Sequence, residues 1–428
     1  MEFPTNRLPI RDNLITPEKL FSERMILMLE NYAIASYWLA LALISTILAY
    51  RLRLSIALVE ICVGVAAAYI ISVFFPDVKT GAESDWLRFL AGSGSILLTF
   101  LSGTELDPES LKENKYEILL VGFVGFAAPF LECSLIAKFI FNWDIRASLL
   151  AGVALSTTSM AVVYSVMLEY GFNSTSYGKG ILGACFINDL GTVIALGLIF
   201  APFTYKTAIF VVLMLISILI LPSLTGRLVQ IYGNKIYAIR TKWILFVLFG
   251  LGALAIWSES EAVLPAYLVG MALSTIIGKD HSYIRRIRTL TIGFLTPFYF
   301  IRAGSFVNIP AIISAPLIFL ILFLGKIITK VFGIYPVIRF FKEHRKERWY
   351  YTLLMSTGLT FGTISALFGL TKGIINQNQY SFLVATVIAS AVIPTAIANY
   401  KFLPKHLLET PMADDDVPQE DANGISTT

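Results

Sequence analysis

The sequence contains little charge. Asp, Glu, Lys and Arg make up 14% of its 428 residues, whereas hydrophobic residues make up 56%, and the mean hydropathy is +0.73. A water-soluble domain needs more charge than this to cover its surface, so these proportions exclude a soluble protein and indicate one that crosses a lipid bilayer many times. The net charge of +4 is small, and we attribute it to loop topology rather than to nucleic-acid binding.

Cysteine and histidine are also scarce. The three cysteines, Cys62, Cys133 and Cys185, fall within apolar segments, so we expect small buried side chains rather than a disulfide framework or a zinc site. The three histidines fall in predicted loops or in the C-terminal tail. A membrane-embedded enzyme needs a nucleophile with a base, or a metal cluster, and the sequence suggests neither. We therefore expect no enzyme and no bound cofactor.

Long apolar segments make up most of the chain. A helix needs about 20 apolar residues to cross the hydrocarbon layer of a bilayer, which is about 30 Å thick. Thirteen segments approach or exceed this length, although the eighth and ninth are short. The sequence therefore predicts an all-α polytopic membrane protein with about 13 transmembrane helices, at residues 32–50, 54–75, 86–106, 116–141, 147–168, 180–201, 207–226, 243–257, 262–277, 289–307, 311–338, 349–371 and 379–400.

The basic residues of the loops predict the orientation. Loops after odd-numbered segments carry far more Lys and Arg than loops after even-numbered segments, and basic loops stay in the cytoplasm. The chain then divides into an extracytoplasmic N-terminal tail (1–31), a membrane domain (32–404) and an acidic cytoplasmic tail (405–428) that we expect to be disordered. The expected location is the inner (plasma) membrane.

Ionisable residues inside the segments are costly, and they mark functional sites by default. They are Glu60, Arg88, Glu105, Glu132, Lys138, Asp189, Arg302, Lys326 and Lys330. Three of them lie near segment ends, where their side chains can reach the interface: Arg88, Glu105 and Lys138. Three lie deeper and can be either structural pairs or functional groups: Glu60, Glu132 and Arg302. Asp189 and Lys326 lie near the middle of their segments, so we expect them to be functional.

Two segments carry clusters of small polar residues at their centres. "VALSTTSMAVV" places Thr157, Thr158 and Ser159 in the fifth segment, and "LMSTGLTFGTIS" places Thr357 and Gly358 in the twelfth. A single cluster can simply allow close helix packing. Because these two segments run in opposite directions, the pair instead predicts two crossed discontinuous helices in an inverted repeat, the arrangement of a transporter with its site at the midplane.

Five motifs occur in order along the chain: "LLTFLSGTELDPESLK", "ALSTTSMAVV", "FINDLG", "TPFYFIRAGSFVNI" and "FLGKIITK". Together they resemble the cation:proton antiporter superfamily, in its branch of NapA-type Na⁺/H⁺ antiporters, and the resemblance covers residues 54–404. It implies a NapA/NhaA-like fold and a homodimer. It also implies that core helices at about 116–201 and 311–400 carry the ion past a dimerisation domain by alternating access.

The resemblance also assigns the site. It implies that Asp189 binds Na⁺ and H⁺ in turn, that Thr158 and Ser159 lie near the ion, and that Lys326 interacts with the residue at position 188. Two positions depart from the family pattern. This chain has Asn188 where NapA has a first aspartate, and it has arginine at position 302, where a small polar residue is more frequent.

Asn188 bears on the stoichiometry. One carboxylate that holds either H⁺ or Na⁺ exchanges them by competition, and an asparagine cannot carry a second proton. We therefore predict electroneutral exchange of one cation for one proton, with Lys326 mainly structural. Thr192 shares a helix face with Asp189 and is either a ligand or a packing residue. Glu132 is either a second acid or a partner of Arg302 or Lys326.

The sequence leaves the choice of cation open among Na⁺, K⁺ and Li⁺. The alternatives are a K⁺/H⁺ exchanger of the same family and a sodium-coupled organic-anion symporter, which can use a similar crossed-helix core. A symporter would require a larger cavity and an anion-binding cluster, which the sequence does not suggest. A channel is disfavoured because inverted, interrupted helices favour alternating access.

Overall fold

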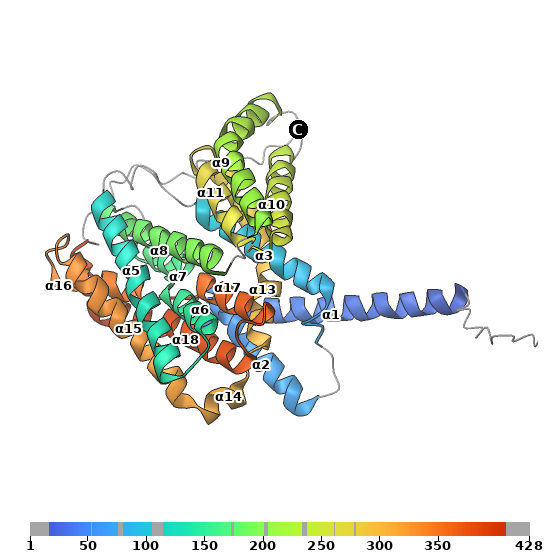
Figure 1. The fold of residues 1–428 in the computed structure, drawn as a ribbon, viewed down its shortest axis with the longest axis horizontal. Coiled ribbons are helices and arrows are strands. Elements are labelled where there is room, and N and C mark those ends of the chain that lie inside the picture. The colour runs from blue at the N-terminus through green and yellow to red at the C-terminus, as the bar shows by residue number, and fades with distance from the viewer. Residues whose placement is uncertain are drawn as a thin grey trace, which may run out of the picture.

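All regular structure in the described part of the chain is helical (Figure 1). The computed structural model describes residues 17–52, 54–75, 80–104, 114–172, 175–200, 204–232, 238–260, 262–277 and 280–407. Each of the thirteen predicted segments overlaps a helix. Nine helical segments in the described ranges are long and apolar enough to cross a membrane, if the interrupted segment Arg345–Thr371 is counted as one. The other four predicted spans are shorter, broken or less apolar. The predicted all-α membrane fold is confirmed.

One group of helices, here called the core bundle, contains both broken helices. In it α5 packs against α6, α8 and α15, and α17 packs against α6 and α18. Asp144 caps the start of α6, and Asn376 with Gln379 forms a capping box at the start of α18. The helices of the core bundle are α5 (Lys115–Leu135), α6 (Ile145–Ser156), α7 (Met160–Glu169), α8 (Ser176–Phe200), α15 (Pro316–Ile338), α16 (Arg345–Met355), α17 (Thr360–Thr371) and α18 (Gln377–Ile397).

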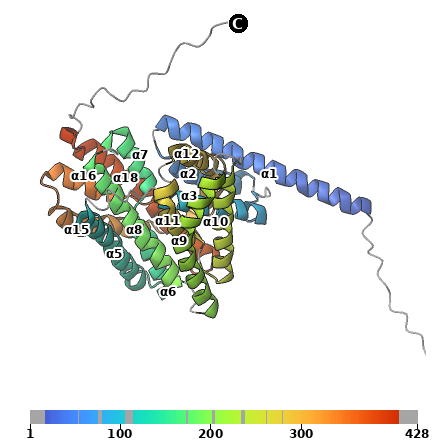
Figure 2. The same cartoon turned by 90° about the horizontal axis from the view of Figure 1, so that it is seen from above.

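The short helix α14 (Ile309–Ser314) packs against α15 and α18 of the core bundle, and the other α-helices form a second group, here called the outer bundle. Its members are α1 (Pro17–Leu52), α2 (Ile56–Phe74), α3 (Asp85–Thr104), α9 (Tyr205–Tyr232), α10 (Ile239–Trp257), α11 (Val263–Ile277), α12 (His281–Leu290) and α13 (Thr296–Ser305). Helix α1 extends well beyond the other helices (Figures 1 and 2). The bundles meet where α11 packs against α8. There the Tyr267 hydroxyl donates to the Phe186 carbonyl at 3.0 Å, and the two rings stack.

Three details differ from the sequence predictions. Helix α1 begins at Pro17, well before the predicted span, and residues Lys405–Leu407 of the predicted tail form a short 3-10 helix. Cys62 is exposed on α2, whereas the other two cysteines are buried as expected. The expectation for Cys62 was wrong because an apolar span does not reveal which of its faces meets lipid. Glu105 and the remaining parts of both predicted tails lie outside the described residues.

Glycines bring α2 and α13 into backbone contact. A Cβ atom added at Gly304 would overlap the carbonyl oxygen of Ile61, and one added at Gly64 would overlap that of Ile301. Helices in a bilayer associate largely through such close packing of small residues. These two glycines therefore set the distance between α2 and α13.

Substituting Gly304 tests this contact. Gly304→Ala should lower the thermal stability of the purified protein, by about 1–3 kcal/mol, because the helices must separate to admit the methyl group. Gly250→Ala on α10, where an added Cβ meets nothing within 4 Å, is the matched control and should be neutral or slightly stabilising. Equal unfolding temperatures for the two variants would contradict this account.

Candidate functional site

Two helices are broken at the centre of the core bundle. Non-helical residues 157–159 separate α6 from α7, and residues 356–359 separate α16 from α17. The two breaks touch, because the backbone N–H of Ser159 donates to the carbonyl of Thr357 at 3.2 Å. The predicted crossing of two discontinuous helices is confirmed. All of the residues in the first break are buried.

The Asn188 side chain of α8 spans the first break. Its Oδ1 accepts a hydrogen bond from the backbone N–H of Thr158 at 2.8 Å, and its Nδ2 donates to the carbonyl of Ser156 at 3.2 Å. A break in a helix leaves such backbone groups without partners, which is expensive in a bilayer. The amide satisfies one donor and one acceptor at once, and a carboxylate could not donate the second bond.

Asp189 follows on the same helix and is only 1% exposed. The amine of Lys330 on α15 interacts electrostatically with Asp189. The same amine donates to Thr158 Oγ1 at 2.9 Å, and that hydroxyl in turn donates to the carbonyl of Met355 at the end of α16. Lys330 therefore joins the first break to the end of α16 through Thr158, within electrostatic range of the carboxylate on α8.

Lys326 lies at the second break instead. Its amine is fully buried and donates to Ser390 Oγ at 3.0 Å, while Ser390 Oγ lies 3.4 Å from the carbonyl oxygen of Gly358. A Cβ atom at Gly358 would overlap the Lys326 amine. The hydrogen bonds of Lys326 and Asn188 thus go to different partners, and no bond joins these two residues in the described part of the chain. Lys330 lies one helical turn further along α15, and this turn brings its amine, rather than that of Lys326, to the first break.

Three predicted threonines are buried and bond to their own chain segments. The hydroxyls of Thr157, Thr192 and Thr357 donate to carbonyl oxygens three or four residues earlier, at 3.1, 3.1 and 2.8 Å. In addition, Thr357 Oγ1 lies 3.4 Å from the backbone nitrogen of Ser159. Thr157 and Thr357 therefore shape the ends of their half-helices, and Thr192 bonds to the carbonyl of Asn188.

Glu132 lies outside this crossing. It is partly buried on α5, where its carboxylate accepts a bond from Cys133 Sγ at 3.1 Å and lies 3.5 Å from Thr329 Oγ1. Within the described residues it forms no ion pair with Lys326 or Arg302. Of the alternatives that the sequence left open, the structure thus disfavours a partnership with either base.

Arg302 and Glu60 belong to the outer bundle. The Arg302 guanidinium donates to the carbonyl of Ala82 at 2.6 Å and lies over the ring of Phe306. Glu60 is buried on α2, and its carboxylate oxygens make no hydrogen bond to the described residues. Neither residue forms an ion pair with the other within the described ranges. Arg302 therefore anchors the start of α3 to α13 rather than joining the crossing.

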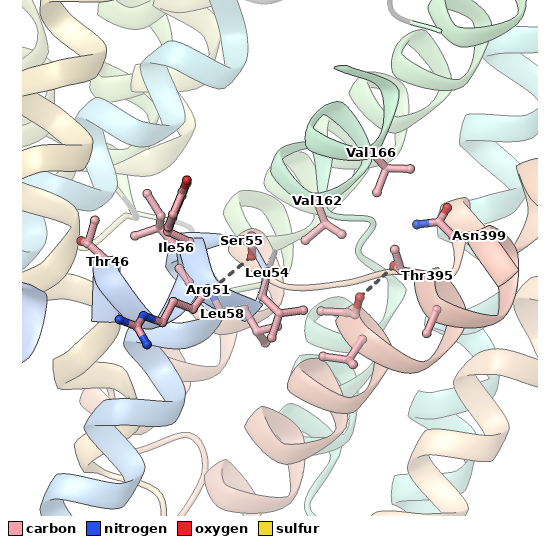
Figure 3. A pocket seen from close by; sticks show the side chains of 15 residues that line it. Thr46, Arg51, Leu54, Ser55, Ile56, Leu58, Val162, Val166, Thr395 and Asn399 are labelled. Carbon is pink, nitrogen blue, oxygen red and sulfur yellow. Dashed lines mark hydrogen bonds between the residues drawn. The ribbon is translucent and has the colours of Figure 1, made fainter. Parts of the chain in front are cut away.

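A crevice of about 1100 Å³ separates α1 and α2 from α7 and α18 (Figure 3). Its polar lining includes Arg51, Ser55, Thr395 and Asn399, which come from both bundles. Val162 also lines the crevice, and its backbone N–H donates to the hydroxyl of Ser159 at 3.4 Å. The crevice thus reaches within one helical turn of the first break.

Comparisons with known proteins identify the family of this chain. The model of the family "Sodium/hydrogen exchanger, transmembrane" matches residues 39–399. The "Probable Na(+)/H(+) antiporter 3" of Methanocaldococcus jannaschii is 25% identical over 333 residues, which are 74% of this chain and 84% of the relative. "Glutathione-regulated potassium-efflux system protein KefC" of Shigella flexneri is 24% identical over 313 residues, which are 70% of this chain but 49% of that relative.

A solved structure shares the fold. The sodium proton antiporter MjNhaP1 from Methanocaldococcus jannaschii superposes with a TM-score of 0.64 at 14% sequence identity, covering 89% of this chain and 99% of the other. At this identity the likeness concerns the fold alone. The family model, in contrast, matches most of the sequence itself. The protein therefore belongs to the sodium/hydrogen exchanger family.

Proposed function

We propose that this protein is a secondary antiporter that exchanges a monovalent cation for H⁺ by alternating access. Na⁺ is the first candidate for this cation. The observation that carries the proposal is the burial of Asn188 and Asp189 against the crossing of two broken helices. A buried carboxylate beside hydroxyls and backbone carbonyls offers the oxygen ligands that a hard cation requires. Sites of this kind at the midplane are typical of secondary transporters.

Asp189 couples the two ions by competition. Its carboxylate holds a proton or helps to coordinate the cation, and both occupied forms are close to neutral. The empty carboxylate is charged, and moving a charge past the apolar surface of the outer bundle is costly. Movement of the empty site is therefore disfavoured, and this makes exchange obligatory.

Thr158 and Ser159 are the proposed additional ligands. The Thr158 hydroxyl lies between the Lys330 amine and the Met355 carbonyl, and the Ser159 hydroxyl accepts a bond from the backbone N–H of Val162, which lines the crevice. A cation that binds Thr158 Oγ1 must displace the Lys330 ammonium, because like charges repel at this distance. Lys330 is therefore the group that competes with the transported cation.

The crevice supports access from one side of the membrane. Arg51 at the end of α1, Ser55 before α2 and Asn399 after α18 all lie on the side that the loop charges assign to the cytoplasm. In this state the site is reached from the cytoplasm, and the N-terminus lies outside. The inner (plasma) membrane location and the homodimer, which follow from the sequence and its resemblance, are part of the same proposal.

Potassium is the second candidate cation. The similarity to the potassium-efflux protein KefC favours it, although this chain spans only about half of that protein. The ligands proposed here are oxygen atoms that suit either ion. A series of Na⁺, K⁺ and Li⁺ in one vesicle assay distinguishes them, and we expect Na⁺ to give the highest rate.

Asp189→Asn removes the carboxylate that both ions share. In vesicles with a pH-sensitive dye and no organic substrate, cation-driven proton movement should fall to the level of empty vesicles. Asp85→Asn, which changes a fully exposed carboxylate at the start of α3, should keep the normal rate. Na⁺-dependent proton movement that persists in Asp189→Asn would refute the proposed role of this residue.

The exchange should be electroneutral, because Asn188 cannot release a proton. An imposed membrane potential should then leave the exchange rate of the wild-type protein unchanged. A rate that follows the potential would overturn the one-to-one stoichiometry. If the dependence disappeared in Lys330→Gln, the second proton would belong to Lys330.

Asn188→Asp adds a second titratable carboxyl group at the first break. It keeps an acceptor for Thr158 but loses the donor to Ser156, so thermal stability should fall by about 1–3 kcal/mol. Exchange should become dependent on the membrane potential, since two protons can then leave for each cation. Asn114→Asp, at a partly exposed amide before α5 that also loses a donor bond, here to Ser176 Oγ, should leave the exchange independent of the potential. An active Asn188→Asp protein that ignores the potential would contradict this prediction.

A further inference from the structure

Two histidines and a glutamate meet at the end of the core bundle that is predicted to face the cytoplasm. His344 is the residue before α16, Glu347 lies in the first turn of α16, and His406 lies in the 3-10 helix after α18. One potential ligand atom from each residue can be chosen so that all three lie within 4.8 Å of one another. The sequence did not suggest this cluster, because its members are far apart along the chain.

The three side chains differ in their current roles. His406 Nε2 lies 2.6 Å from Glu347 Oε1, and the Glu347 side chain is 9% exposed. The ring of His344 lies 4.7 Å from that of His406 between centroids, and His344 makes no capping bond to α16. One carboxylate is therefore held in a buried position, and two imidazoles beside it are accessible from solvent.

Packing holds the two parts of the chain that supply these ligands. Trp349 on α16 stacks on Phe402 at 5.5 Å between ring centroids, and the Tyr350 hydroxyl donates to Asn399 Oδ1 at 3.3 Å. The Tyr177 hydroxyl donates to the backbone carbonyl of Glu347 at 2.8 Å. The ligand positions are thus fixed by contacts that do not involve the ligands' own side chains.

We propose that His344, Glu347 and His406 bind one divalent transition-metal ion of the Zn²⁺ class. Two imidazole nitrogens and one carboxylate oxygen form a common protein ligand set for Zn²⁺, with a water completing the tetrahedron. Ligand atoms in such a site are about 3.3 Å apart, given metal–ligand bonds of about 2.0–2.1 Å. Rotation of the exposed imidazoles closes the remaining gap and replaces the hydrogen bond between His406 and Glu347.

The surrounding charge favours this class of metal over Mg²⁺ or Ca²⁺. Four basic residues adjoin the ligands in the sequence: Arg345, Lys346, Arg348 and Lys405. Because these four basic residues outnumber the one acidic neighbour, Glu343, a hard cation held mainly by charge would be repelled, and the cluster itself offers it one carboxylate. Imidazole nitrogen binds Zn²⁺, Ni²⁺ or Cu²⁺ through a lone pair, and hard cations prefer oxygen ligands.

Titration of the purified full-length protein, after treatment with a chelator, tests the proposal. Zn²⁺ should bind with a stoichiometry of one ion per chain and raise the unfolding temperature, and Co²⁺ should give the visible absorption of a tetrahedral site. Mg²⁺ should do neither. No binding of Zn²⁺, or an equal response to Mg²⁺, would overturn the proposal.

Substitutions of the two proposed histidine ligands test where the Zn²⁺ ion binds. His344→Ala and His406→Ala should each weaken Zn²⁺ binding by at least about tenfold, since even the loss of a group that supports a ligand costs 10–100-fold. His281→Ala, at the start of α12, is the matched control and should bind as the wild-type protein does. The unfolding temperature without metal and the exchange rate in metal-free vesicles should stay unchanged in His344→Ala. Unaltered Zn²⁺ affinity in both cluster variants would assign the ion to another place and overturn the proposal.

Discussion

Two interrupted helices in a bilayer impose the constraint on which this structure depends. Each break frees backbone donors and acceptors at a depth where water cannot satisfy them. The breaks therefore pair with each other, as in the bond from Ser159 to Thr357, and they draw polar side chains from α8, α15 and α18. Apolar side chains cannot form hydrogen bonds to these backbone groups, so a bundle with apolar residues alone could not contain the two breaks. Without the breaks, the bundle would have no polar centre.

Each of the two buried lysines places its amine at one of the two breaks. Lys330 bonds to Thr158 just after the end of α6, and Lys326 lies at Gly358 just after the end of α16. Both positions follow the C-terminal end of a half-helix, where exposed carbonyls carry partial negative charge and a cation is stabilising. One turn of α15 separates the lysines, so a single helix supplies the amines for both breaks.

The sequence predicted most of the fold and part of the site. Apolar length located the helices, and the paired hydroxyl clusters located the breaks, because both signals are local. Local signals do not reveal which face of a span points inward, so Cys62 was misplaced. They also cannot decide between Lys326 and Lys330, which share a helix face and differ by one turn. From the sequence, Asn188 was expected to be unable to carry a second proton, and the structure shows in addition that its side chain bonds to the backbone of the break. That role depends on a contact between residues 30 apart in the chain.

The asparagine has a consequence for the charge balance of the site. Among the described residues, Asp189 is the carboxylate next to Asn188 at the first break, and the amine of Lys330, which bonds to Thr158, interacts with it electrostatically. The carboxylate has the same net charge whether it holds a proton or a monovalent cation, so the two loaded forms of the crossing differ in charge only if Lys330 changes its own charge. One-to-one exchange therefore requires Lys330 to keep the same charge in the proton-loaded and the cation-loaded forms, moving away from Thr158 rather than losing its proton. Release of that proton instead would couple a second H⁺ to each cation. The stoichiometry thus depends on whether the ammonium group of Lys330 can bond to another acceptor within the core bundle when the cation binds.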